Sequence, residues 1–236
     1  MKLLHDVRVL TQARENKTSY VSNTVTRAEA TVENVRKGVL SHSPKLTKHL
    51  EDQSITWWPQ GLNDNTFPSL GDKEIRTCQP FVSKVLAIFS KGKVKVKSST
   101  VKGKVNNSKT SQEVKIMSIP YLSAPSTPTV GKKRPDCVFY EANKTGNAAI
   151  TLIGEVKSGG DGNFADEDIG QLTDVTTRVM RLQPFRRYIL SFLTDGRRFQ
   201  FYRCRRVKSD YSFEYSSIFE GKEAWQVRYE LEWMRI

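Results

Sequence analysis

The sequence is poor in the residues that build zinc sites and disulfide frameworks. Its 236 residues include only three cysteines, Cys78, Cys137 and Cys204, and only three histidines. No two cysteines form a CxxC pair, and none has a histidine near it in the sequence. We therefore expect neither a zinc site nor a disulfide framework. This cysteine usage is typical of a reducing compartment and predicts an intracellular protein.

Long apolar runs and an excess of acid are also missing. No stretch approaches the roughly 18 apolar residues of a transmembrane helix, and residues 1–6 turn polar too early for a secretory signal. Acidic residues number 25 against 38 Lys and Arg, which gives a formal net charge of +13. That charge favours a polyanionic partner, nucleic acid or an acidic membrane surface, although basic surfaces also keep proteins in solution. The length suits one globular domain, or one domain with an extension.

Residues 1–66 carry few structural signals, and we assign them to a partly helical N-terminal extension. Apolar residues at helical spacing predict an amphipathic helix over 24–39, and turn-forming residues are frequent over 41–66. We expect the Trp57-Trp58 pair to pack on the core; the alternative is a platform for stacked bases of a single strand.

Residues 67–236 form the predicted main domain, in which helices and strands alternate. We expect a helix to begin at 69–72 and to be kinked or split by Pro80. The lysine-rich segment 91–115 predicts strand pieces, either a phosphate-contacting edge or an edge guarded by lysine against aggregation. Further expectations are a loop over 120–128, a helix over 166–182, strands over 188–193, 198–205 and 211–219, a two-residue turn at Asp195-Gly196, and a closing helix over 223–236. A strand pair, a crossover helix and another strand imply an α/β or α+β fold with a central mixed sheet flanked by helices.

The most informative stretch runs over residues 134–171. Asp136 stands just before a predicted strand, 137–141, and an apolar run over 148–154 leads into Glu155-Val156-Lys157. Side chains on a strand alternate between its faces, so Glu155 and Lys157 share one face. Charges at the end of an apolar strand are costly unless they have partners. A hairpin would therefore bring Asp136, Glu155 and Lys157 together.

Two carboxylates beside an ammonium group suit a site for a divalent cation. Mg²⁺ and Mn²⁺ accept carboxylate oxygens, so Asp136 and Glu155 are predicted metal ligands, with the carbonyl of Val156 as a further one. Lys157 would orient the attacking water or stabilise developing negative charge. The basic run Lys132-Lys133-Arg134 would hold a nucleic-acid backbone. The alternative is a surface salt bridge between Lys157 and one of the acids.

Pro135-Asp136 followed by Glu155-Val156-Lys157 resembles the PD-(D/E)xK motif of the restriction-endonuclease-like superfamily. The order of elements is similar too: a helix with a glutamate, a hairpin, a strand ending in ExK, and a helix with a glutamine. The resemblance covers roughly residues 70–205 and implies a restriction-endonuclease-like core. It also implies site residues: Asp136 and Glu155 as metal ligands, Lys157 as the catalytic lysine, Glu74 as the acid of the first helix and Gln171 as the residue of the following helix. If the resemblance is set aside, Glu74 is interpreted as an acid that compensates a helix dipole, and Gln171 is interpreted as an exposed helix residue.

The run Gly170-Gln171-Leu172 and the segment 192–202 are also similar to the nuclease-like domain of Crinkler-type effectors. This second resemblance implies a toxin that acts on host DNA in the nucleus. In such effectors a kinase-like domain often follows, whereas here no Gly-rich loop, HRD or DFG motif follows.

We therefore expect a Mg²⁺- or Mn²⁺-dependent nuclease that hydrolyses phosphodiester bonds, with DNA favoured over RNA. The alternative is a catalytically inactive nucleic-acid-binding or interaction module on the same fold. A third class is an effector that binds anionic membranes or proteins through its lysine strands. The intact trio favours the nuclease, because a pure binder has no need of it. Nothing in the sequence identifies an interface, although many nucleases of this fold act as dimers.

Overall fold

The computed structural model describes residues 29–34, 37–52, 57–97, 111–115, 121–123, 126–130, 133–141, 144, 146–208 and 210–227. Its strands are β1 Leu40–His42, β2 Lys93–Lys97, β3 Ser111–Lys115, β4 Tyr121–Ser123, β5 Cys137–Tyr140, β6 Ile150–Val156, β7 Tyr188–Thr194, β8 Arg198–Val207 and β9 Asp210–Glu220. Its α-helices include α3 Pro44–Asp52, α4 Gln79–Lys91, α5 Asp166–Leu182 and α6 Gly221–Gln226. Residues 29–34 are helical as well, and 3₁₀ turns occupy Asp64–Thr66 and Asn147–Ala149.

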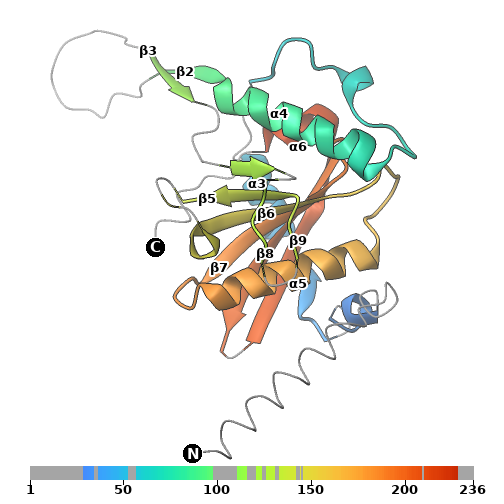
Figure 1. Cartoon of the computed structure of the whole chain (residues 1–236), viewed down its shortest axis with the longest axis vertical. Helices are drawn as coiled ribbons and strands as arrows, with labels where there is room; N and C mark the ends of the chain where they lie inside the picture. The colour runs from blue at the N-terminus through green and yellow to red at the C-terminus, as the bar shows by residue number, and fades with distance from the viewer. Residues whose placement is uncertain are drawn as a thin grey trace, which may run out of the picture.

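The centre of the fold is a seven-stranded sheet in the order β1-β9-β8-β7-β6-β5-β4, and β2 and β3 pair separately. β6 and β7 are parallel and joined through α5, β1 and β9 are parallel, and the other neighbours in the large sheet are antiparallel. In Figure 1, α5 runs across the strands on its own, whereas α4 and α6 lie together elsewhere on the sheet. The predicted mixed sheet flanked by helices is therefore confirmed. None of the described helices is long and apolar enough to cross a membrane.

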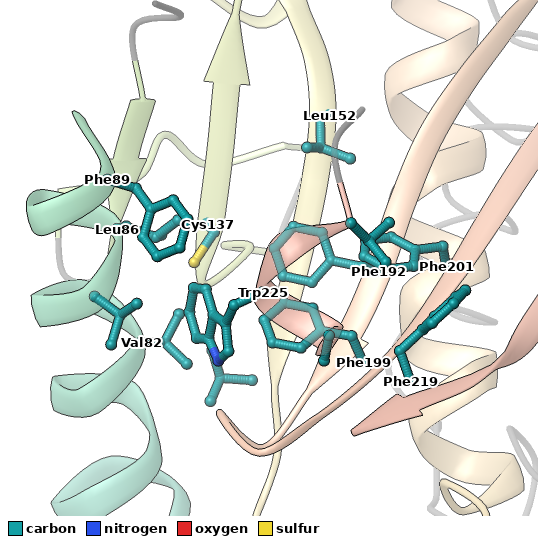
Figure 2. Close-up of a cluster of buried hydrophobic side chains, with 14 of the residues drawn as sticks. Val82, Leu86, Phe89, Cys137, Leu152, Phe192, Phe199, Phe201, Phe219 and Trp225 are labelled. Atoms are coloured by element: carbon teal, nitrogen blue, oxygen red, sulfur yellow. The ribbon is translucent and has the colours of Figure 1, made fainter. Parts of the chain in front are cut away.

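One face of the sheet carries a core rich in aromatic rings. Phenylalanines of the sheet meet Trp225 of α6 and the apolar side of α4, as Figure 2 shows. The ring centroids of Trp225 and Phe199 are 4.7 Å apart. Trp57 and Trp58 pack edge-on against Phe89 at 5.4 and 6.1 Å, so the prediction that this pair packs on the core is confirmed.

The other face is covered by α5. The helix buries residues at helical spacing, Leu172, Val175 and Val179, against the sheet, as the sequence pattern predicts. Between the two cores, Gly154 of β6 leaves room for a ring. A Cβ there would lie 2.2 Å from Cζ of Phe192, so a larger side chain would displace the ring. β6 is buried along its whole length, and it therefore gives rigid support to the residues at its carboxyl end.

The N-terminal part differs most from expectation. Residues 41–66, predicted as turns, contain α3, and β1 just before it pairs in parallel with β9. Leu46 and Leu50 of α3 are buried in the aromatic core. Residues 40–52 and 57–66, assigned from the sequence to an extension, thus take part in the sheet and core of the main domain. Of the predicted helix over 24–39, residues 29–34 are helical and 37–38 form a turn; residues 24–28 and 35–36 lie outside the described part.

Three later predictions also need correction. Residues 121–123, predicted as loop, form β4 because pairing with β5 outweighs their turn-rich surroundings. The β7–β8 connection spans residues 195–197, not two residues, because Asp195 Oδ1 accepts the backbone N–H groups of both Arg197 and Arg198. The closing helix, predicted over 223–236, begins earlier and ends earlier: α6 runs from Gly221 to Gln226. Residues 228–236 lie outside the described part.

Candidate functional site

The β5–β6 hairpin brings Asp136 and Glu155 face to face. Cys137 pairs with Gly154 in the antiparallel register, so the residue before β5 lies across from Glu155 of β6. Oδ2 of Asp136 accepts a 2.8 Å hydrogen bond from the backbone N–H of Val156. The Val156 side chain is buried in the aromatic core, and Glu155 points to the α5 face. The predicted alternation of faces is therefore confirmed.

Gln171 of α5 connects Glu155 with Lys157. Its Nε2 donates to Oε2 of Glu155 at 2.9 Å, and its Oε1 accepts from Nζ of Lys157 at 3.1 Å. Nζ of Lys157 also lies 3.8 Å from Oε2 of Glu155. Both charged side chains are nearly excluded from water, so the amide holds two buried charges in one geometry.

Glu74 reaches the same place through an unusual helix start. Residues Glu74–Cys78 form a π-helical turn that leads directly into α4, with Pro80 in the first turn of α4. Proline has no N–H to give to a carbonyl of the preceding turn, which favours such a widened turn. The predicted kink or split near Pro80 is thus found as a change from a π-helical turn to an α-helix, and the helical segment begins at Glu74 rather than at 69–72. Gln79, at the junction, donates to Oε1 of Glu74 at 3.2 Å and to Oδ1 of Asp136 at 2.8 Å.

The carboxyl groups of this cluster are destabilised in their charged form. Burial raises the pKa of Glu155 to about 8, and the charge of Asp136 contributes to the rise. Burial also raises the pKa values of Asp136 and Glu74, in both cases against the opposing effect of Lys157. Oε1 of Glu155 is buried and has no hydrogen-bond partner among the described residues. A cation between these carboxylates would offset each of these costs.

A cavity of about 260 Å³ opens beside the cluster. Its lining includes Glu74, Lys157 and the first turn of α5. Asp168, in that turn, lies 3.7 Å from Nζ of Lys157. Burial raises the pKa of Asp168, and Lys157 opposes the rise. The lysine is therefore held by two groups on one face of α5, an amide and a carboxylate, at the edge of an accessible space.

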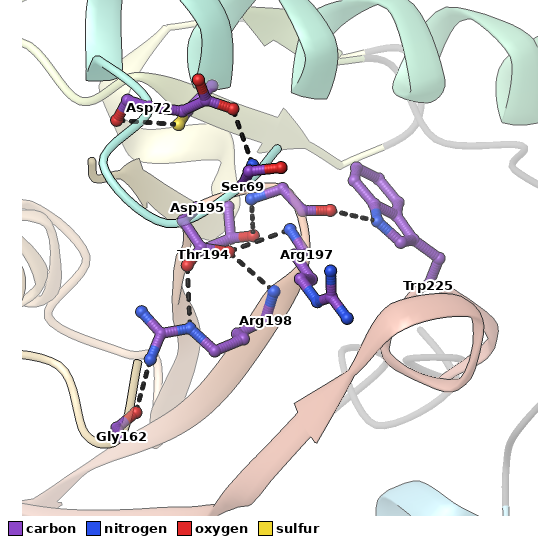
Figure 3. Close-up of polar contacts among 10 residues, drawn as sticks. Ser69, Asp72, Gly162, Thr194, Asp195, Arg197, Arg198 and Trp225 are labelled. Carbon is purple, nitrogen blue, oxygen red and sulfur yellow. Dashed lines mark hydrogen bonds and ion pairs between the residues drawn. The ribbon is translucent and has the colours of Figure 1, made fainter. Parts of the chain in front are cut away.

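The loop after Lys157 is fastened to the sheet by Arg198, which also lines the cavity. Nε of Arg198 donates to Oδ2 of Asp195 at 2.8 Å, and Nη1 donates to the carbonyl of Gly162, as Figure 3 shows. Its guanidinium lies 5.0 Å from the centre of the Phe164 ring. The loop also bonds to the approach to α4: Gly159 N–H donates to the carbonyl of Asp72 at 2.9 Å. The cavity wall is therefore built from segments that are distant in sequence.

The structure brings five of the predicted site residues together: Glu74, Asp136, Glu155, Lys157 and Gln171. Val156 adjoins them through its N–H, and its carbonyl remains a predicted ligand. Of the basic run, Lys132 lies outside the described part, Lys133 forms a backbone bridge with Val130, and Arg134 is exposed two residues before Asp136. Among the described residues, no three His, Cys, Asp or Glu side chains are arranged to hold a metal ion.

Sequence reasoning missed Gln79, Asp168 and Arg198. Asp168 precedes Gln171 by one helical turn, so the shared face of α5 was a usable signal. Gln79 follows Glu74 by five residues, a spacing that faces one side only in a π-helical turn. Arg198 meets a carbonyl 36 residues away, and no local pattern indicates that contact.

Comparison with known proteins adds one similarity. A family model described as a domain of unknown function (DUF6826) matches residues 105–186. The matched segment contains the hairpin and the whole of α5, with Asp136, Glu155, Lys157 and Gln171, and it excludes Glu74 and Arg198. No curated protein and no solved structure matches the chain.

Proposed function

We propose that this chain is a Mg²⁺- or Mn²⁺-dependent nuclease that hydrolyses phosphodiester bonds. One observation carries the proposal: Asp136 and Glu155 face each other at the end of a buried hairpin, beside a lysine fixed by Gln171. A surface salt bridge does not fit this arrangement, because Glu155 is only 1% exposed and the lysine 7%. Carboxyl groups whose pKa values are raised by burial and by a nearby charge are concentrated at functional sites, which favours a chemical role for this pair.

The residues present fit a hard divalent cation. Mg²⁺ is commonly held by one or two carboxylates and several waters, so Asp136 and Glu155 are enough protein ligands. The unpartnered Oε1 of Glu155 is an orphaned acceptor of the kind that a cation would satisfy. When bound, the ion would polarise a phosphate oxygen and lower the pKa of bound water.

The side chains around the carboxylates have separate tasks. Lys157 supplies a fixed positive charge at the cavity, where it stabilises negative charge on a phosphate or orients the attacking water. Gln171 holds Lys157 and Glu155 in register. Gln79 holds Asp136 and connects it to Glu74, so the acid on the π-helical turn is positioned at the same centre.

The order of elements supports a restriction-endonuclease-like core as part of this proposal. A helix with Glu74 at its start precedes three antiparallel strands, β4 to β6, and α5 then crosses to the parallel strand β7. The carboxylates lie at the end of β6, next to the start of α5. This is the order that the PD-(D/E)xK resemblance implies.

The net charge of +13 supports nucleic acid as substrate, with DNA favoured. Lys133 and Arg134 directly precede the site and would contact the backbone, together with Lys132. The similarity to Crinkler-type effectors adds a narrower proposal, that the substrate is host DNA in the nucleus. The second candidate function is a nucleic-acid-binding module on the same fold, without cleavage. If no cation binds, the raised pKa values of Asp136 and Glu155 favour this binding module.

The test is cleavage of supercoiled plasmid with Mg²⁺, with Mn²⁺ and with EDTA. We expect nicking with either cation, none with EDTA, and a loss of at least about 100-fold for Asp136→Ala and Lys157→Ala. Arg197→Ala is a suitable control, because this exposed arginine adjoins the β7–β8 turn without lining the cavity. Cutting that persists in EDTA or in both site variants contradicts the proposal. Salt-sensitive binding without cutting favours the binding module.

A further inference from the structure

The connection between α5 and β7 exposes an aromatic ring completely. Phe185 is 97% exposed, more than any other large hydrophobic side chain among the described residues. Two further apolar side chains at the same end of the molecule, Leu182 and Val207, are each 49% exposed. Burial of apolar surface is the main favourable term in folding, so a phenylalanine held wholly in water contributes nothing to this fold.

The segment that carries Phe185 is tightly held. The buried side chain of Gln183 donates to the carbonyls of Ile150 at 2.8 Å and Asn147 at 3.1 Å. Arg186 N–H closes the turn on the carbonyl of Gln183 at 3.0 Å. Pro184 fixes the backbone dihedral just before the ring. The ring is therefore presented outward by a fixed turn.

The end of β8 adjoins this turn. Arg206 N–H donates to the carbonyl of Arg187 at 3.0 Å, and its Nη2 donates to the carbonyl of Met180 at 2.7 Å. These two bonds bring the last turn of α5, residues 183–187 and the β8–β9 connection to one place. Figure 1 shows this end of α5 and the β8–β9 turn away from the start of α5, where the candidate site lies.

Exposed cations stand on the segments that meet at this end of the molecule. We define the Phe185 surface by six exposed side chains. Three are apolar and at least 49% exposed: Leu182, Phe185 and Val207. The other three are basic: Arg181, Arg187 and Lys208. Arg205 lies nearby and shares Glu214 with Arg203. No ion pair to a described residue neutralises Arg181, Arg187 or Lys208, and the exposed acid Asp210 stands two residues after Lys208. The surface is therefore positively charged.

We propose that the Phe185 surface binds single-stranded nucleic acid, with one base stacked on the Phe185 ring and the flanking phosphates on the arginines. Aromatic rings beside cations are the usual means of binding single strands without sequence preference. Guanidinium groups bind phosphate in a bidentate manner and stack on bases, which suits arginine more than lysine. This inference goes beyond the proposed nuclease function, because binding at this surface requires no cleavage.

The chemistry of the surface favours a nucleic acid over other partners. A stable protein interface buries about 800 Å² on each partner around a packed apolar centre, and three apolar side chains are too few to provide one. Stable membrane anchoring needs a large apolar face or two anchoring signals. One flat ring between phosphate-binding groups has the size and shape of a site for a single base.

The test is fluorescence anisotropy of a labelled oligothymidylate in EDTA, with the full chain and with the intactness of the oligonucleotide checked on a gel. We expect Phe185→Ala to weaken binding by about 10-fold, since stacking contributes roughly 1–3 kcal/mol per base. The double variant Arg181→Gln/Arg187→Gln should lower the slope of log affinity against log salt by about 1.4, which is about 0.7 for each phosphate contact with a single strand. Duplex of the same length should respond less to Phe185→Ala, because its bases are already stacked.

Matched controls separate this surface from a general effect of charge or apolar exposure. Val32→Ala removes an apolar side chain that is 55% exposed elsewhere, and Lys45→Gln/Lys222→Gln removes two distant exposed charges. Both should bind like the parent chain.

Unchanged oligothymidylate binding in the Phe185 and arginine variants overturns the proposal. The proposal is also overturned if Phe185→Ala weakens only the binding of anionic vesicles, which indicates a membrane site. It is equally overturned if the substitution changes only self-association in sedimentation, which indicates that a second copy of the chain binds there. These readouts do not depend on nuclease activity, so the proposed function can fail while this inference holds.

Discussion

Gln171 of α5 donates a 2.9 Å hydrogen bond to Glu155 at the end of β6. The same amide accepts from Lys157, so a neutral side chain connects two charged groups that also form an ion pair at 3.8 Å. The arrangement keeps Oε1 of Glu155 available and holds the ammonium group at the cavity.

Replacement of Gln171 by alanine should therefore impair activity more than stability. We expect Gln171→Ala to lower kcat by about 10- to 100-fold. Activity typically falls by this factor when a residue that orients the ligands of a metal site is replaced. The free energy of unfolding should change by less than about 1.5 kcal/mol, because alanine suits a helix and the amide is half-buried. Steady-state cleavage and urea unfolding measure the two effects. Gln226→Ala, which removes a half-buried glutamine bonded to the carbonyl of Trp57, should leave kcat unchanged; an equal loss there would contradict the assigned role.

The two neighbouring glycines of the site loop should respond differently to alanine. A Cβ on Gly159 would lie 2.1 Å from the carbonyl oxygen of Ser69, whereas a Cβ on Gly160 would lie 3.2 Å from Nη2 of Arg198. The first clash involves backbone and cannot be relieved by a rotamer. We expect Gly159→Ala to lower the free energy of unfolding by about 1–3 kcal/mol and Gly160→Ala by much less. Equal effects in urea titrations would show that the loop is not fastened to residues 69–72 as described.

The Asp195–Arg198 ion pair should contribute strongly to stability because both side chains are buried. Asp195 is 1% exposed and also accepts two backbone N–H groups of its turn. We expect Asp195→Ala to lower the free energy of unfolding by about 3–5 kcal/mol, since it leaves the Arg198 charge without its partner. Chemical denaturation gives the value. The control is Asp174→Ala, which breaks a half-exposed helical pair with Arg178 and should cost below about 0.5 kcal/mol. A similar small loss for Asp195→Ala would refute the prediction.

Without a cation, stability should fall as the pH rises through the range in which Glu155 titrates. The pKa of Glu155 rises from an ordinary value of 4.5 to about 8 in the folded chain, chiefly by burial. Between these values the folded state holds a proton that the unfolded state has released, so the free energy of unfolding decreases with pH. The slope is at most about 1.4 kcal/mol per pH unit for one group. Urea titrations in EDTA at several pH values should show the decrease, and Glu155→Gln should flatten it. An equally steep decrease in the variant would assign the effect to another group.

Local patterns in the sequence predicted much of the fold, and contacts between distant segments account for the rest. The hairpin around Asp136 and Glu155, α5 and β7 to β9 each carry their own apolar pattern and turn residues. β1 and β4 are only three residues long, and their pairing with β9 and β5 decides their state. The same holds for the site. Gln171 was predicted from the PD-(D/E)xK resemblance, as the residue of the helix that follows the motif, whereas Gln79 meets Asp136 from 57 residues away.

The most direct measurement of the central claim is Mn²⁺ binding by isothermal titration calorimetry, because the claim is that Asp136 and Glu155 hold one cation. We predict one site per chain in the parent protein and at least about 10-fold weaker binding for Glu155→Gln and Asp136→Asn. Glu223→Gln, which replaces an exposed acid of α6, should bind as the parent does. Parent-like binding in both site variants, or no heat of binding in the parent protein at millimolar Mn²⁺, would contradict the account.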